Sequence, residues 1–97
     1  MPDEYIVKFH PDFFKDLDKL NKKEVKIVNK QIEKIKENPT RFRRLVGVPN
    51  CYRVRTLDLR IVYYLEGKTI WFLAVQRRKI IYTIYFRRLY RIKQKLK

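Results

Sequence analysis

The sequence predicts an α+β fold, in which an N-terminal strand and an antiparallel helix hairpin pack on an antiparallel β-meander sheet, followed by a short basic C-terminal helix. Two observations predict this fold. Apolar residues recur at helical spacing up to residue 37, and from residue 43 onward the period changes to the two residues typical of strands. A chain of 97 residues is expected to form a single domain, so we assign residues 1–97 to one unit.

The first 40 residues are expected to contain one strand and two helices. Residues 5–10 alternate loosely and fit a short strand. We expect Asp12 to cap the first helix, whose apolar positions are Phe13, Phe14, Leu17 and Leu20. A second helix is predicted over residues 22–37, with an apolar stripe of Val25, Val28, Ile32 and Ile35. Asn38-Pro39 ends it, and residues 21–23 leave room only for a tight connection, which predicts the hairpin.

The second part of the chain is expected to form the sheet and the last helix. Strands are predicted near residues 43–46, 52–56, 60–65 and 69–76. The last three are expected to form the meander, because only short breaks separate them. The chain closes with Tyr85, Leu89, Ile92 and Leu96 at three- and four-residue steps. These steps fit a short basic helix, whose start the pattern leaves ambiguous.

Positive charge is concentrated in the second part of the chain. The net charge is +15, of which residues 1–40 contribute +1 and residues 41–97 contribute +14. All eleven arginines lie in residues 41–97. The planar guanidinium fork suits bidentate contacts with phosphate, so this part of the chain is interpreted as phosphate-directed. The alternative is a generally basic protein, such as a thermophile protein rich in Lys, Ile and Glu, although the segregation of arginine argues against it.

The segment YRVRTLDLRIVYY carries three of these arginines. Arg53 and Arg55 share one face of a strand. If residues 56–59 form a four-residue hairpin loop, Arg55 lies opposite Arg60 and Arg53 lies opposite Val62, so that all three arginines share a face. Like charges opposite one another destabilise a sheet, and an anionic ligand would relieve the repulsion. The alternative is that this face is the solvated side of a half-buried sheet.

The segment QRRKIIY adds a second group of cations. Arg77, Arg78 and Lys79 follow the last predicted strand, and Tyr82 comes three residues later. These cations can join the sheet arginines at one rim, where Tyr82 could stack on a base or transfer a proton. The alternative is a solvated basic loop followed by a core tyrosine.

Several kinds of site are excluded by the residues themselves. His10 is the only histidine and Cys51 the only cysteine, so neither a zinc site nor a Cys/His nucleophile can be assembled. The basic part has no carboxylate cluster for magnesium, and no glycine-rich phosphate loop occurs. We therefore expect neither a metal nor another cofactor. No apolar run approaches the ~20 residues that span a bilayer and no secretion signal opens the chain, so a cytoplasmic protein without membrane contact is expected.

Cleavage of RNA remains open to a chain with this composition. RNA supplies its own nucleophile, the 2′-hydroxyl, so a protein need only align it, stabilise the phosphorane charge and manage two protons. Arginines can stabilise the charge, and for the protons the chain offers Tyr, Lys and Arg. Neighbouring cations favour tyrosinate and neutral lysine, which is the useful direction for proton transfer. Such an enzyme would gain from a partner that presents the RNA already bent.

The order of elements and two motifs resemble the RelE/ParE toxin superfamily, specifically its RelE branch. The motifs are LVGVPNCYRVRTLDLRIVYYLEG and VQRRKIIY, and the resemblance covers nearly the whole chain. It implies the toxin of a type II toxin–antitoxin pair, an mRNA interferase that enters the ribosomal A site, contacts mRNA and rRNA, and cleaves mRNA without metal. It also implies a small acidic RelB-like antitoxin as inhibitor.

The resemblance assigns roles by position. Arg53 and Arg55 would grip RNA or rRNA phosphates, and Arg60 and Arg78 would lie nearest the scissile phosphate. Tyr82 matches the C-terminal tyrosine implicated in proton transfer or base stacking. Three further residues are candidates: Lys79 for catalysis, and Arg77 and Tyr85 for RNA contact. Arg77 stands where many members have histidine, and Tyr85 is an alternative functional tyrosine.

Two other functions stay open at this point. The related ParE branch shares the fold and poisons DNA gyrase without catalysis, but generally lacks the arginine and tyrosine set. A basic RNA-binding module without a toxin role is the other alternative. In either toxin reading, the antitoxin is expected to be acidic and extended, wrapping the basic face or displacing the C-terminal helix, because +14 on residues 41–97 needs neutralising.

Overall fold

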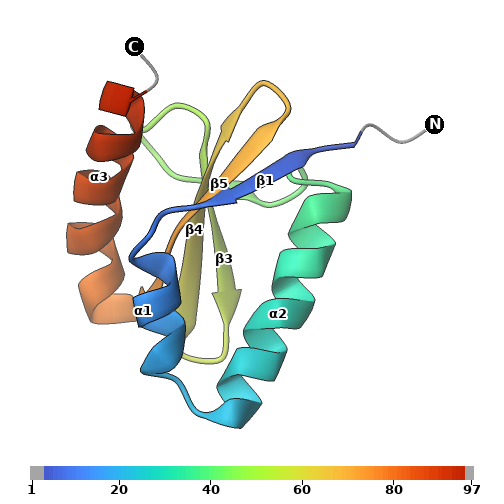
Figure 1. The fold of residues 1–97 in the computed structure, drawn as a ribbon, viewed down its shortest axis with the longest axis vertical. Helices are drawn as coiled ribbons and strands as arrows, with labels where there is room; N and C mark the ends of the chain where they lie inside the picture. Colours follow the sequence, from blue (N-terminus) through green and yellow to red (C-terminus); the bar gives the residue numbers. More distant parts are fainter. Residues whose placement is uncertain (1–3, 96–97) are drawn as a thin grey trace.

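A computed structural model describes residues 4–95 and confirms the predicted α+β fold (Figure 1). In chain order the elements are β1 (Ile6–Phe9), α1 (Phe13–Asp18), α2 (Lys22–Glu37), β2 (Arg43–Arg44), β3 (Cys51–Thr56), β4 (Leu59–Glu66), β5 (Thr69–Arg77) and α3 (Arg78–Lys95). Leu96, which the spacing assigns to the last helix, lies outside the described residues. Within the described part of the chain, no helix is both long and apolar enough to cross a membrane.

The predicted meander is the antiparallel part of a larger, mixed sheet. Its five strands lie in the order β1-β5-β4-β3-β2, and β1 runs parallel to β5 while the other neighbours are antiparallel. The N-terminal strand therefore completes the sheet at one edge. The predicted strand over residues 43–46 shortens to Arg43–Arg44, because the loop that follows leaves the sheet through Gly47 and Asn50, both at positive φ.

The sheet has a hydrophobic core on each face, with α1 and α2 on one side and α3 on the other (Figure 1). The α2 side buries alternate strand residues, among them Tyr52, Val54, Ile61 and Tyr63. The α3 side buries the complementary set, including Cys51, Val62 and Tyr64, against Ile81, Tyr85, Leu89 and Ile92. Side chains that alternate along β3 and β4 thus point into two different cores.

Helix α2 has the predicted bounds because both ends carry clear signals. Asn21 and Glu24 form a reciprocal capping box, with N to O distances of 2.8 and 3.1 Å. Asp12 occupies the predicted N-cap position of α1, but its side chain makes no capping hydrogen bond. Asp12 has helical backbone angles rather than the extended ones of a cap, and its side chain pairs with Lys15 instead. Its backbone N–H donates to Nδ1 of His10 at 3.1 Å.

The final helix is longer than predicted and begins earlier. It has 18 residues and starts at Arg78, directly after β5, so the basic segment QRRKIIY is a strand-to-helix junction and not a loop. The helix is held by four apolar side chains in the α3-side core and by one buried ion pair described next. Burial of this stripe, more than the local pattern of the basic segment, sets its length.

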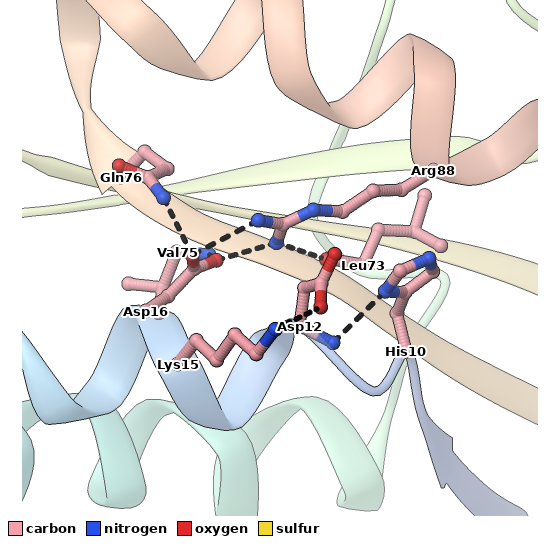
Figure 2. Close-up of polar contacts among 8 residues, drawn as sticks. All are labelled: His10, Asp12, Lys15, Asp16, Leu73, Val75, Gln76 and Arg88. Atoms are coloured by element: carbon pink, nitrogen blue, oxygen red, sulfur yellow. Dashed lines mark hydrogen bonds and ion pairs between the residues drawn. The ribbon is translucent and has the colours of Figure 1, made fainter.

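A buried cluster of polar contacts joins α1, β5 and α3 (Figure 2). Arg88 of α3 binds Asp16 of α1 through both terminal nitrogens, at 2.6 and 3.0 Å, and the two side chains are 12% and 2% exposed. The same carboxylate accepts from the backbone N–H of Val75 at 3.0 Å and from Nε2 of Gln76. Asp16 thereby accepts a hydrogen bond from a backbone N–H on the part of the β5 edge that β1 does not cover.

Arg88 also binds the backbone at a bulge in β5. The pairing of β4 with β5 shifts register between Val62 and Tyr63, which leaves Leu73 as an extra residue on β5. Nη1 of Arg88 donates to the carbonyl oxygen of Leu73 at 2.9 Å. One guanidinium therefore binds both a carboxylate and a bulged carbonyl, and it holds α3 against the sheet.

We predict that Asp16→Ala destabilises the protein by about 3–5 kcal/mol, because it leaves the Arg88 guanidinium buried without its partner. The measurement is urea unfolding followed by circular dichroism. Lys36→Ala is the matched control, since it breaks an exposed pair with Glu33 and is expected to cost less than about 1 kcal/mol. Equal losses in the two variants would contradict the role given to the buried pair.

A second prediction concerns His10, which is 4% exposed. Burial, and then the positive charge of Arg88, lower the pKa of His10 below its ordinary 6.5; Arg91 and Lys95 act in the same direction and Asp12 opposes them. The folded state thus binds this proton less readily than the unfolded state. The stabilisation is complete above pH 6.5 and decreases as the pH falls from there toward the lowered pKa.

The measurement is the free energy of unfolding at pH 7.5 and at pH 5.5, at one ionic strength. His10→Gln keeps a side-chain acceptor for the Asp12 N–H without titrating in this range, so it should lose most of the pH dependence. The pKa of Asp12 and that of Glu24 are lowered, so both carboxylates stay ionised at either pH. An unchanged pH dependence in His10→Gln would refute the assignment.

Candidate RNA-cleavage site

The predicted register of the arginine strands is confirmed. Arg55 lies opposite Arg60 and Arg53 lies opposite Val62, so the three arginines share one face of the sheet. The turn is tighter than predicted, since Thr56 pairs with Leu59 and only two residues connect the strands. Its first residue, Leu57, adopts a φ of 55°. This angle lies in the left-handed region, which residues other than glycine adopt uncommonly.

The neighbouring strand adds a fourth arginine to this face. Arg43 of β2 pairs with Arg53 of β3, so like charges oppose one another twice, once on each side of β3. Such pairs destabilise a sheet. The charged face lies on the α3 side, beyond the end of the apolar core that α3 covers, and it is therefore open to a ligand.

Helix α3 completes the site. Arg78 is its first residue and Tyr82 follows one turn later, and both line a pocket of about 460 Å³. The six lining residues are Arg43, Arg53, Arg55, Arg60, Arg78 and Tyr82, which we call the arginine pocket. Because α3 begins here, the positive end of its dipole adds to the charge of five guanidinium groups. The charge of the pocket therefore favours an anion.

Arg60 is the buried member of the arginine pocket. It is 7% exposed, and its Nη1 donates to the carbonyl oxygen of Leu59 at 3.0 Å. Among the described residues it forms no ion pair with a carboxylate. A buried cation without a counter-ion is costly, and an anion in the pocket would remove that cost.

Tyr82 is oriented by an arginine of the pocket. Nη1 of Arg53 donates to the phenolic oxygen of Tyr82 at 2.8 Å. The phenolic oxygen therefore accepts from Arg53, and its own proton is left for donation to another group. This contact joins β3 to α3, residues that are 29 apart in the sequence.

Three of the predicted site residues lie outside the arginine pocket. Arg77 is held by carboxylates, with Nη1 at 2.8 Å from Glu24 and 2.6 Å from Asp58. Its predicted contact with RNA would have to displace them. Tyr85 is 7% exposed and packs in the α3-side core, and Lys79 lies on the exposed surface of α3. Five predicted residues, Arg53, Arg55, Arg60, Arg78 and Tyr82, are brought together.

The sequence did not predict two parts of the pocket, which are Arg43 and the N-terminal end of α3 with its dipole. Arg43 stands in a run of basic residues, and only the pairing of β2 with β3 distinguishes it from Arg44, whose guanidinium lies over Tyr52 on the other face.

Within residues 4–95, no group of three or more His, Cys, Asp or Glu side chains is arranged to hold a metal ion. The pocket offers only fixed positive charge and one phenol.

Comparison with known families matches residues 7–82 to the family described as ParE toxin of type II toxin-antitoxin system. No curated protein sequence matches the chain. Among solved structures, a mutant of the E. coli toxin RelE in the free state superposes with a TM-score of 0.77 at 21% identity, covering 89% of this chain and 98% of that one.

Two archaeal toxins in complex with antitoxins are similar as well. The RelE of the RelE-RelB complex from Pyrococcus horikoshii has a TM-score of 0.66 and 26% identity, over 78% of this chain and 97% of that one. The toxin–antitoxin complex from Methanococcus jannaschii has a TM-score of 0.61 and 30% identity, over 79% and 96%. A chromosomal ParDE system from P. aeruginosa matches with a TM-score of 0.63 and 17% identity, over 75% and 95%.

We predict that inorganic phosphate stabilises the protein by binding in the arginine pocket. At phosphate concentrations about tenfold above the Kd, the gain is about 1.4 kcal/mol, which raises the Tm of a domain this size by roughly 6–11 °C. The measurement is differential scanning calorimetry against chloride at matched ionic strength. Arg55→Thr should raise the Tm in chloride by removing a repulsion, and should reduce the gain from phosphate.

The control is Arg44→Ala, which removes one positive charge from the opposite face of the sheet. It should keep the full gain from phosphate. If Arg55→Thr and Arg44→Ala gained equally, the phosphate would be acting on the net charge and not in the pocket.

Proposed function

Because the chain belongs to the ParE toxin family of type II toxin–antitoxin systems, within the RelE/ParE superfamily, we propose that it is a ribosome-dependent, metal-independent endoribonuclease that cleaves mRNA. The observation that carries the proposal is the arginine pocket, in which five guanidinium groups surround one tyrosine. Fixed cations around a space that a phosphodiester can enter are what a phosphoryl-transfer transition state needs when no metal assists.

In this proposal the RNA supplies the nucleophile. The 2′-oxygen attacks the adjacent phosphorus, its proton passes to solvent water, and the bond from phosphorus to the 5′-oxygen of the next nucleotide breaks. A 2′,3′-cyclic phosphate and a free 5′-hydroxyl result. Arg60, at the buried end of the pocket, and Arg78, at the start of α3, stabilise the charge on the phosphorane oxygens.

Tyr82 handles the leaving group. Its oxygen already accepts from Arg53, so its proton is available to the 5′-oxygen as that bond breaks. Arg43, Arg53 and Arg55 hold the flanking phosphates and keep the strand in place. The chain presents no histidine here, because His10 directly follows β1. The acceptor of the 2′-hydroxyl proton is therefore weak, and alignment of the RNA by the ribosome compensates for this weakness.

The inhibitor of this toxin is proposed to be a small acidic antitoxin. Solved RelE toxins occur in complexes with RelB antitoxins, from E. coli and from archaea. The charge of +14 on residues 41–97 favours an acidic partner over a neutral one. Its association should weaken as ionic strength rises.

A gyrase-binding toxin is the second candidate, and a specific observation favours it. The matching family is described as a ParE toxin, and the ParDE system of P. aeruginosa shares the fold. The arginine pocket favours RNA cleavage, since a protein that only binds gyrase has no need for five arginines around a tyrosine. The two candidates are separated by assaying both activities on one preparation.

We predict ribosome-dependent cuts in mRNA when the wild-type toxin is added to a translating extract. Arg78→Ala removes a stabilising charge and should lower the cleavage rate about 10²–10³-fold. Tyr82→Phe removes the proton donor and should lower it about 10²–10⁴-fold. Cuts are mapped by primer extension, and the same preparation is tested for inhibition of gyrase supercoiling.

Two variants serve as matched controls. Arg44→Ala makes the same charge change as Arg78→Ala on the opposite face of the sheet. Tyr5→Phe removes a hydroxyl from a half-buried tyrosine that directly precedes β1, at the opposite edge of the sheet from β2. Both should cleave at the wild-type rate. An absence of cuts together with inhibition of gyrase would refute the nuclease proposal, and cuts that survive Arg78→Ala and Tyr82→Phe would refute the residue roles.

A further inference from the structure

An exposed aromatic stripe runs along α3 away from the arginine pocket. Tyr82, Phe86 and Tyr90 follow one another at four-residue steps and are 41%, 59% and 62% exposed. Lys79 and Lys93 fall on the same side of the helix, at 100° per residue. Large exposed aromatic side chains in a row, with a cation at each end, are not explained by packing of α3 on the sheet.

The loop between β2 and β3 forms the facing wall. Val48 and Pro49 line a shallow groove of about 230 Å³ with Phe86 and Tyr90, and Lys93 stands at its rim. Val46 in the same loop is 99% exposed. This loop lies near the C-terminal half of α3 in Figure 1. The groove and the arginine pocket therefore lie along the same side of α3, with Tyr82 in the pocket and Tyr90 in the groove.

We propose that this aromatic stripe is a base-stacking platform, which binds the unpaired nucleotides of single-stranded RNA next to the phosphate held in the arginine pocket. The proposal rests on the proposed function, and it extends the substrate from one phosphodiester to a strand of several nucleotides. Single-stranded nucleic acid is bound by this combination, in which cations follow the backbone and aromatic rings receive the bases.

The spacing of the rings fits bases. Residues four apart on a helix are separated by about 6 Å along its axis, at 1.5 Å per residue. One base between two rings needs about 7 Å, twice the 3.4 Å rise of stacked bases. Small movements of the exposed rings Phe86 and Tyr90 would close that difference. Stacking accepts any base, so the platform adds affinity without reading sequence.

Charge favours RNA over an apolar protein partner on this stripe. Lys79 stands one turn before the row of rings and Lys93 one turn after it, and no acidic residue occurs in α3. An apolar helix from a partner would require the lysines to be moved aside, whereas a nucleic acid uses both the rings and the ammonium groups. The phenol of Tyr82 is shared by the pocket and the stripe, so a strand that enters the pocket reaches the stripe without a gap.

The test measures Kd by fluorescence anisotropy for a six-nucleotide, fully 2′-O-methylated RNA, which cannot be cleaved because its nucleophile is blocked. A second oligonucleotide has the same backbone but lacks the bases beside one central nucleotide. Wild type should bind the complete strand about tenfold more tightly than the abasic one. The double variant Phe86→Ala/Tyr90→Ala should bind both strands equally. Both residues are exposed, so the variant is expected to fold.

Ile80→Ala is the matched control. Ile80 is 46% exposed on the same helix, about 120° around its axis from Phe86, and its removal should leave the tenfold preference intact. If Phe86→Ala/Tyr90→Ala kept that preference, the platform would be overturned. Loss of affinity for an acidic, leucine-containing helical peptide in that variant, with RNA binding unchanged, would also overturn it, by assigning the stripe to a protein partner.

Failure of this inference is distinguishable from failure of the proposed function. Arg55→Ala acts on the backbone only, so it should weaken the complete and the abasic strand by the same factor. If it did so while the stripe variant had no effect, the pocket would stand and the platform would fall. If Arg55→Ala weakened neither strand, the arginine pocket would not bind RNA, and the proposed function would fall as well.

Discussion

The ion pair between Asp16 and Arg88 is the contact on which the rest of the site depends. Arg88 is bound at both terminal nitrogens and also holds the bulged carbonyl of Leu73, so α3 has one position on the sheet (Figure 2). That position places the start of α3, with Arg78 and Tyr82, against the arginines of β3 and β4. A helix free to slide would separate the phenol from Arg53 and would open the pocket.

The pocket is unfavourable for the folded protein and favourable for an anion. Arg43, Arg53, Arg55 and Arg60 oppose one another in two like-charged pairs across three strands. The repulsion is tolerated because the two cores, one on each face, hold the strands in register through Tyr52, Tyr63 and their neighbours. Selection for stability alone would remove these arginines. They are kept at a place where a phosphate can bind.

Charge is also distributed by element. Where arginines serve structure, they meet carboxylates, as Arg77 does with Glu24 and Asp58 and Arg88 does with Asp16. Where they line the pocket, none of the six lining residues is acidic. Identical side chains thus stabilise the fold in one place and prepare a binding site in another, and only the neighbours distinguish the two.

The sequence by itself determined the fold class, the bounds of α2 and the face shared by Arg53, Arg55 and Arg60, because period and capping are local and a strand alternates with period two. It did not determine the addition of Arg43, the start and length of α3, or the burial of Tyr85. Tertiary structure decided these. Strand pairing brings Arg43 opposite Arg53, and a buried carboxylate 72 residues away selects Arg88 as the anchor of α3. Neither partner can be identified from residues nearby in the chain.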